Sequence, residues 1–415
     1  MNSNMTRKRL LMIGGWTDLF EKSKACGFDL TVIQRKSDLK TRDFEVADHL
    51  ATLPMNSPEV VEVACAMHRE QPFDAVISFQ EYGVLNAARI GDRLQLFSNP
   101  LAAVELARDK GLMRQRLVDA GIPSIPFALA SSAQEVLDFA SKVGWPVIVK
   151  PVNASGSDCV RKLTAASEVA EAVDRILRTH PHAHVLVEQY MVGPEVSVEG
   201  ISWDGQHRIL GTTDKITTGA PNFVELGHTH PSSLPADTLA QIEAMTLRVL
   251  EAVGHRHGPS HTEIIVTADG PRLVETHTRT GGDRIFEIVE LVHGVDLFTS
   301  TLQGFAGDFP ALPEQPASAA AIRFFHLPPG RVSVLEGIEE ARQMPGVVRV
   351  DHSLAVGKEV GPLRHSGDRM GYILVQAPTR EQAVARVEAA MAQVRIEVEP
   401  PQAPAASTAT AALAA

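Results

Sequence analysis

Two short apolar segments, residues 262–266 and 272–276, each carry one carboxylate, and a turn-forming sequence joins them. The first segment holds Glu263, the second holds Glu275, and residues 267–271 (Thr-Ala-Asp-Gly-Pro) favour a tight turn. This pattern predicts a β-hairpin that places the two carboxylates near each other. Such oxygen ligands suit Mg²⁺, which completes its shell with water and phosphate oxygens. Arg279, four residues after Glu275, can hold a phosphate or an oxyanion, so the segment indicates ATP-dependent chemistry.

Composition is that of an ordinary enzyme. A chain of 415 residues with 44% hydrophobic and 21% charged residues predicts two to four domains. Its net charge of -11 argues against nucleic acid or an anionic membrane as the main partner. No apolar run approaches the roughly 20 residues that span a bilayer, and the run at 10–13 is too short for a signal peptide. Three scattered cysteines, without a CxxC pair, favour a cytoplasmic location.

Strand and helix signals alternate in the first hundred residues. Strands are expected at 9–13, 30–33 and 75–78, and helices at 19–25 and 60–69. This alternation predicts a parallel sheet covered by helices. Gly14 and Gly15 follow the first strand without a GxGxxG motif, so a tight turn is favoured over a dinucleotide site.

Two lysines stand in settings that suit a bound nucleotide. Residues 99–117 predict one long helix, capped by Asn99 and containing Lys110. Lys150 ends the apolar strand 147–151, and the loop that follows contains Ser155, Gly156 and Ser157. Backbone N–H groups of such a loop can bind phosphates, although a plain hairpin turn is the alternative.

Further acidic and polar groups follow the next strand, 184–188. Glu188 and the linker Gln189, Tyr190 and Met191 can frame an adenine ring, and Glu195 can accept hydrogen bonds from ribose hydroxyls unless it faces solvent. Residues 214–230 have a weak secondary-structure signal, so a binding loop is expected to carry the polar side chains Lys215, Glu225 and His228.

Taken in order, these residues resemble the ATP-grasp superfamily over residues 5–310. Within it the chain is most similar to L-amino-acid ligases of the bacilysin-synthetase type. That closer likeness rests on five short sequences, which are Asp214-Lys215, residues 223–225, Gly227-His228, residues 261–263 and residues 279–282. Residues 364–375 resemble the C-terminal domain of the same ligases.

The resemblance implies an α/β (α+β) ATP-grasp fold. Its expected parts are a Rossmann-like parallel-sheet domain (1–98), a linking helix (99–122), a lid (123–190), a central antiparallel-sheet domain (191–310), a C-terminal α+β subdomain (318–398) and a disordered tail (400–415).

It also implies a carboxylate–amine ligase that forms an amide through an acylphosphate, with ATP and Mg²⁺ (or Mn²⁺) as cofactors. Lys110 and Lys150 would hold the α- and β-phosphates, and Lys215 the γ-phosphate. Glu263 and Glu275 would bind the metal, while Arg279 would stabilise the acylphosphate and the oxyanion. The expected partners are a small carboxylic acid and an amino acid, and the expected oligomer is a homodimer.

Substrate contacts are implied for Glu225 and His228, and Gly282 and Asp283 would border the acyl side chain. Glu81, after the predicted strand 75–78, is another substrate candidate, with helix initiation as the alternative. His277 occupies the position where many ATP-grasp enzymes have a metal-binding Asn.

Alternatives remain for the metal and for the function. A soft-metal site at His228/His230 or His255/His257 lacks accompanying Cys or carboxylate ligands. A carboxylase or formyl-phosphate ligase of purine or biotin type is the second enzyme hypothesis. A nucleotide-binding protein without catalysis is the third, although such a protein would not require all these charged residues.

Overall fold

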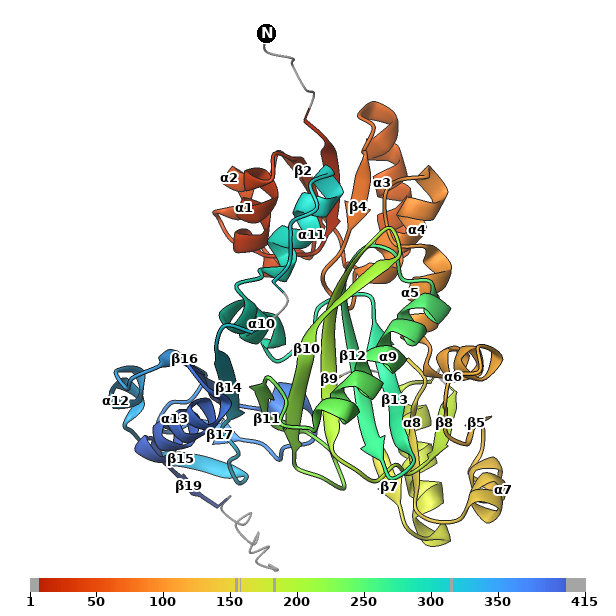
Figure 1. The fold of residues 1–415 in the computed structure, drawn as a ribbon, viewed down its shortest axis with the longest axis vertical. Coiled ribbons are helices and arrows are strands. Elements are labelled where there is room, and N and C mark those ends of the chain that lie inside the picture. Colours follow the sequence, from red (N-terminus) through yellow and green to blue (C-terminus); the bar gives the residue numbers. More distant parts are fainter. Residues whose placement is uncertain (1–6, 154–155, 157, 182–183, 314–315, 401–415) are drawn as a thin grey trace, which may run out of the picture.

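The computed structural model describes residues 7–400 apart from 154–155, 157, 182–183 and 314–315. Ser155, Ser157 and the tail from residue 401 therefore lie outside the described residues. The described residues form four sheets, and Figure 1 shows the N-terminal part above the long central sheet, with the lid and the C-terminal part on either side below.

The N-terminal part is the predicted parallel sheet, in the order β3-β2-β1-β4. Leu10 to Ile13 are all buried because helices cover both faces of the sheet. Its elements are β1 (Arg9–Ile13), α1 (Thr17–Ala25), β2 (Asp29–Gln34), η1 (Lys36–Asp38), α2 (Asp43–Val46), β3 (His49–Thr52), α3 (Glu59–Glu70), β4 (Ala75–Ile77) and α4 (Val84–Leu94).

The prediction of a single long helix over residues 99–117 is wrong. The segment forms two helices, α5 (Leu101–Arg108) and α6 (Lys110–Asp119), separated at Asp109. The side chain of Asp109 accepts hydrogen bonds from the backbone N–H groups of Gly111 and Leu112, which caps the second helix. Asn99 is not a helix cap, since its side chain instead binds backbone groups of Arg256 and His257. Lys110 therefore begins a helix rather than lying in the middle of one.

The lid is a four-stranded antiparallel sheet in the order β5-β8-β6-β7. Two helices bury one of its faces through an apolar core that includes Val136, Val149 and Ile176. Its elements are β5 (Phe127–Ala130), α7 (Ala133–Val143), β6 (Val147–Pro151), β7 (Arg161–Leu163), η2 (Ala166–Glu168), α8 (Val169–Thr179) and β8 (Val185–Gln189).

The central sheet runs without interruption into the C-terminal part, in the order β13-β12-β9-β10-β11-β14-β18-β16. Its central elements are β9 (Glu195–Trp203), β10 (Gln206–Thr217), β11 (Glu225–His230), α9 (Ala236–Val253), β12 (Gly258–Thr267), β13 (Gly270–His277), α10 (Ile285–His293) and α11 (Leu297–Ala306). Phe298 of α11 packs against Trp16 and Phe79, so this helix returns to the N-terminal sheet.

The C-terminal elements are β14 (Ala319–Phe324), β15 (Gly330–Glu336), α12 (Ile338–Arg342), β16 (Val347–His352), β17 (Glu359–Val360), η3 (Ser366–Asp368), β18 (Gly371–Ala377), α13 (Arg380–Gln393) and β19 (Arg395–Glu399). Three of them form a small sheet, β17-β15-β19. The predicted boundary near residue 318 thus falls between two hydrogen-bonded strands of one sheet, because β14 pairs with β11.

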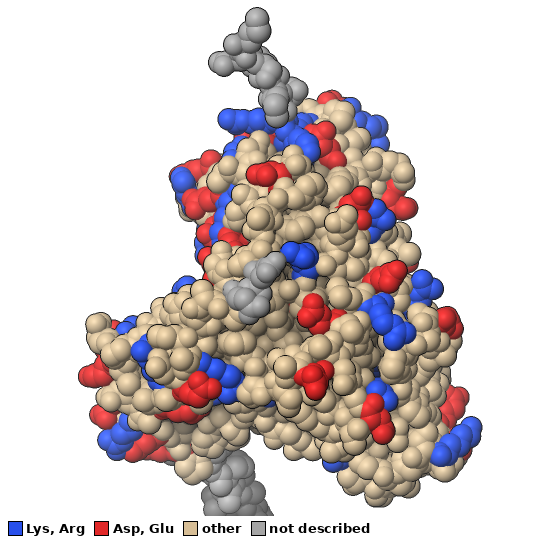
Figure 2. Space-filling model, viewed as in Figure 1, with Lys and Arg blue, Asp and Glu red and all other residues tan. Residues whose placement is uncertain are grey.

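None of the described helices has the length and apolar character needed to cross a membrane. On the face drawn in Figure 2, basic and acidic side chains are intermixed over the surface.

Buried neutral histidines predict acid-sensitive folding. His255 is 1% exposed between α9 and β12, and burial lowers its pKa to about 3. In the unfolded chain it takes up a proton near pH 6.5, so its contribution to stability is present above that pH and is lost as pH falls toward 3. Between pH 7.5 and 5.5 the loss should be about 1 kcal/mol. We expect His255→Leu to reduce the pH dependence of the unfolding free energy, measured in urea, by about that amount.

The exposed His49 provides the control. An unchanged pH dependence in His255→Leu, or an equal change in His49→Gln, would contradict this assignment.

Candidate active site

A cavity of about 370 Å³ lies between the lid and the central sheet. Most of the site residues predicted from sequence line it, which are Lys110, Lys150, Gly156, Glu188, Gln189, Tyr190, Met191, Glu195, Lys215, Glu225, His228, Glu263, Glu275, Arg279, Gly282 and Asp283. Glu81 is not among the lining residues, although it contacts two of them, Arg279 and His277. The cavity thus gathers residues that are up to 256 positions apart in sequence, from Lys110 to Ser366.

The prediction of a binding loop at residues 214–230 is wrong for most of that segment. Strand β10 ends with residues 214–217, and residues 225–230 form strand β11. Lys215 and His228 are direct neighbours across this antiparallel pair. Their polar side chains face the cavity, which hides the apolar alternation that normally identifies a strand.

Lys150 belongs to a buried ion network. Its Nζ lies 2.6 Å from Glu188 Oε2, and the other carboxylate oxygen of Glu188 binds Arg114 of α6. Burial disfavours the charge on Glu188, but Arg114 and Lys150 outweigh it and lower its pKa to about 2. Arg114 also donates hydrogen bonds to the carbonyl oxygens of Leu273 and Val274, at 2.7 and 3.1 Å. The network therefore connects the lid strands to β13.

Both carboxylate oxygens of Glu188 are thus already used by cations. Sequence reasoning assigned this residue to the adenine ring, whereas its contacts point to holding Lys150 in place.

Lys215 lies among three carboxylates on neighbouring strands. Its Nζ is 2.6 Å from Glu195, 3.0 Å from Glu263 and 3.7 Å from Glu225. Although burial opposes the charge, these carboxylates raise the pKa of Lys215 well above its usual value. A permanently charged ammonium at this point can neutralise a phosphate as well as a carboxylate.

Glu263 and Glu275 are direct partners across the β12–β13 pair, as the predicted hairpin requires. Glu263 contacts Lys215, and Glu275 lies 2.9 Å from Lys110 Nζ. Burial disfavours charge on both groups, yet these lysines and nearby histidines keep each pKa low, at about 2 for Glu263. Two ionised oxygen ligands side by side fit the preference of Mg²⁺.

Two histidines support this carboxylate pair. His277 Nε2 lies 2.9 Å from Glu275 Oε1, and His261 lies between Glu199 at 2.7 Å and Glu263 at 3.2 Å. His277, at the position where many ATP-grasp enzymes have a metal-binding Asn, thus contacts the carboxylate of Glu275. Gly281 leaves room for His261, because a Cβ there would lie 2.7 Å from its Nδ1.

Arg279 is held by the N-terminal part of the chain. Its Nε donates a hydrogen bond to Glu81 Oε2 at 2.6 Å, and Arg108 lies 2.6 Å from the other oxygen of Glu81. Burial raises the pKa of Glu81, but Arg279, His277 and Arg108 outweigh burial and lower it to about 2. Glu81 is therefore a fixed anion beside the cavity, with Arg279 as its partner.

The C-terminal part also contributes to the cavity, through Ser366 in its lining and through Arg369. Arg369 forms a double ion pair with Asp283, and Asp283 accepts a hydrogen bond from His228 Nε2 at 3.0 Å. Ser366 donates a hydrogen bond to Glu225 at 2.6 Å. Residues 364–369 thus close one side of the site.

Sequence reasoning missed several residues that complete the site. His261 is two positions before Glu263 and therefore shares its strand face. Its place beside Glu263 could have been predicted from this spacing, because alternate residues of a strand face the same side. Arg108 and Arg114 gave no local signal, because each acts on a residue distant in sequence. Arg369 lies in the segment 364–375 that resembles the ligases' C-terminal domain, but its pairing with Asp283 was not predicted. The histidine pairs considered for a soft metal have other partners. His228 contacts Asp283, and His230 contacts His293 at 2.8 Å. His255 lies 3.2 Å from the carbonyl oxygen of Gly258, and His257 accepts a hydrogen bond from the backbone N–H of Asp204.

Three family models match the chain in order. They are described as ATP-grasp N-terminal domain (residues 20–96), ATP-grasp domain (143–287) and L-amino acid ligase C-terminal domain 2 (323–399).

Named relatives are found at moderate identity. Dapdiamide A synthase of Enterobacter agglomerans is 25% identical over 75% of this chain and 78% of its own. Carnosine synthase 1 of Gallus gallus is 33% identical over 59% of this chain and 28% of its own. The crystal structure of an L-amino acid ligase from Bacillus licheniformis superposes with a TM-score of 0.81 at 23% identity, covering 95% and 99% of the two chains. The chain belongs to the ATP-grasp superfamily and carries the C-terminal domain of its L-amino acid ligases.

Proposed function

We propose that this protein is an ATP-dependent ligase that joins the carboxylate of one amino acid or related acid to the amine of an amino acid. The observation that carries the proposal is the convergence of Lys110, Lys150, Lys215, the carboxylate pair and Arg279 on one cavity. The C-terminal domain match and the named ligase relatives support the amide-forming branch of the superfamily.

For the nucleotide, we propose that Lys110 and Lys150 bind the α- and β-phosphates and that Lys215 reaches the γ-phosphate. Each lysine lies beside a carboxylate, at 2.6–2.9 Å, so each is already positioned. Gln189, Tyr190 and Met191 would contact the adenine and Glu195 the ribose, with Glu188 holding Lys150.

Glu263 and Glu275 would hold Mg²⁺, or Mn²⁺ in its place. When bound, the ion neutralises charge on the phosphates during transfer. His261 and His277 would keep the two carboxylates oriented through their hydrogen bonds.

The proposed reaction has two steps, phosphoryl transfer to the acyl substrate and attack by the amine. A carboxylate oxygen of the acyl substrate attacks the γ-phosphorus, the bond to ADP breaks, and an acylphosphate forms. The amine then attacks the acyl carbon, phosphate leaves with the C–O bond electrons, and the amine loses a proton. Arg279, fixed by Glu81, would stabilise the negative oxygen that develops at the acyl carbon.

Glu225 and His228 would contact the substrates' charged ends. Glu225 can pair with an ammonium, and His228, three residues later in β11, also lines the cavity. Asp283 is already neutralised by Arg369, so we propose that it shapes the acyl pocket with Gly282 and does not attract a cationic side chain.

The test is phosphate release from ATP and Mg²⁺ across single amino acids, amino-acid pairs and small dicarboxylic acids, with mass spectrometry of products. We expect release only with an acid and an amine together, and a product mass equal to their sum less water. Release with bicarbonate or formate, without an amide, would instead support the carboxylase or formyl-phosphate hypothesis. Measurable ATP binding without release from any pair would support a protein without catalysis.

A further inference from the structure

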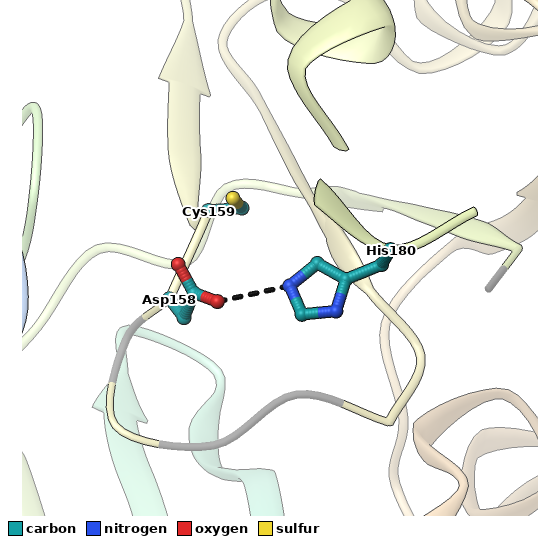
Figure 3. A group of neighbouring side chains, drawn as sticks. All are labelled: Asp158, Cys159 and His180. Carbon is teal, nitrogen blue, oxygen red and sulfur yellow. Dashed lines mark hydrogen bonds and ion pairs between the residues drawn. The ribbon is translucent and has the colours of Figure 1, made fainter. Parts of the chain in front are cut away.

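A second group of metal-binding side chains lies at the end of the Gly-rich loop, in the lid. Asp158, Cys159 and His180 place one carboxylate oxygen, the thiol sulfur and one ring nitrogen all within 4.8 Å of one another. Asp158 Oδ2 and His180 Nε2 are 2.9 Å apart (Figure 3). Among the described residues, no other group of three or more His, Cys, Asp or Glu side chains meets this criterion.

The local backbone brings these side chains together. Asp158 and Cys159 are consecutive, and consecutive side chains of an extended chain point to opposite sides. Cys159 has a φ of +58°, which breaks that alternation, so both side chains reach His180 at the end of α8. Cys159 is 7% exposed and belongs to the lid core, whereas Asp158 and His180 are partly exposed and accessible to an ion.

A catalytic role for this thiol is disfavoured. Burial and the neighbouring Asp158 raise the pKa of Cys159, so it is a protonated and weak nucleophile at neutral pH. His180 is engaged with Asp158 and, with Cys159, is absent from the lining of the nucleotide cavity.

We propose that Asp158, Cys159 and His180 form a site for a borderline-soft divalent ion such as Zn²⁺, distinct from the carboxylate pair on β12 and β13. Thiolate, imidazole and carboxylate are the ligand types that Zn²⁺ takes, and three of them leave a fourth position for water. Binding displaces the thiol proton to solvent, and His180 binds the ion through Nε2 with its ring proton on Nδ1. Two anionic ligands then balance the charge of the ion.

Occupation of this site would connect the nucleotide cavity to α8. Asp158 lines the cavity together with Gly156, and His180 follows the last turn of α8. A bound ion would thus fix the end of the Gly-rich loop to the lid helix. This consequence depends on the proposed nucleotide role of the loop, whereas the metal site itself does not.

The test uses Co²⁺ as a probe, added to chelator-treated full-length protein without nucleotide. A thiolate-to-Co²⁺ charge-transfer band in the near ultraviolet, saturating at one ion per chain and displaced by Zn²⁺, is expected. Cys159→Ser should abolish the band, and His180→Asn should raise the half-saturating Co²⁺ concentration at least about tenfold. Cys26→Ser and Cys65→Ser are matched controls that should keep the wild-type spectrum.

Absence of the band in the wild-type protein would overturn the proposal, and so would a band that survives in Cys159→Ser. The wild-type spectrum alone shows whether the band is absent, so the proposal remains testable even if Cys159→Ser folds poorly. Oxygen-bound Co²⁺ at Glu263 and Glu275 gives no thiolate band. The measurement requires no turnover, so failure of the metal site and failure of the ligase proposal are distinguishable.

Discussion

Replacement of Arg279 by alanine is expected to lower kcat about 10²- to 10³-fold while ATP binding remains close to that of the wild-type protein. The guanidinium contacts Glu81 and the carbonyl of Thr280, whereas the three proposed phosphate-binding lysines pair with other carboxylates. Its loss therefore removes charge stabilisation at the reacting acyl group and leaves the nucleotide contacts in place. Steady-state kinetics and a direct ATP-binding titration measure the two effects separately.

The fold should tolerate this change, because Arg108 still neutralises Glu81. Arg93→Ala is the matched control, since Arg93 pairs with Glu62 on the exposed surface of α3 and α4. Loss of ATP affinity in step with kcat would show that Arg279 anchors the nucleotide instead.

Replacement of Glu188 by leucine is expected to reduce the free energy of unfolding by about 3–5 kcal/mol. The change leaves Arg114 and Lys150 buried without their shared carboxylate, with side chains only 1% and 7% exposed. Urea unfolding monitored by fluorescence and circular dichroism measures the loss. The ligase reaction should fail as well, because Lys150 loses its orienting partner.

A triple variant with Arg114→Leu, Glu188→Leu and Lys150→Met separates charge from packing. Removing all three charges together should recover part of the lost stability, since no buried ion remains unpaired. Equal stability of the single and triple variants would show that packing, and not an unpaired charge, causes the loss. Glu62→Leu, at an exposed ion pair, should change stability by at most about 1 kcal/mol.

The sequence predicts best what local pattern encodes. The hairpin that pairs Glu263 with Glu275 is confirmed, because apolar strands joined by a tight turn specify their own register. The parallel N-terminal sheet is also confirmed. There the alternation of strand-period and helix-period segments along the sequence predicted a parallel sheet covered by helices.

Prediction failed where tertiary contacts override the local pattern. The break at Asp109 was missed because Ala, Leu, Arg and Lys on both sides favour continuous helix, while the Asp109 cap and the bond from Lys110 N to Val152 O favour a new helix. Strand β11 was missed because its cavity-facing polar residues obscure the hydrophobic period. The partners Arg108, Arg114 and Arg369 could not be found from spacing, since each ion pair joins separate parts of the chain. The predicted role of each site residue stays a prediction.

The pairing of β11 with β14 sets a limit on how this protein can be divided or recombined. Four residue pairs, from Gly227–Arg323 to His230–Ala320, join the two parts by backbone hydrogen bonds. A truncation just before β14 would convert β11 into a bare sheet edge, and such edges recruit strands from other molecules. Chimaeras between related enzymes should therefore exchange β14 and its C-terminal partners as a unit whose first strand retains this register. Modularity in the sequence of such enzymes does not imply that their domains can be separated physically.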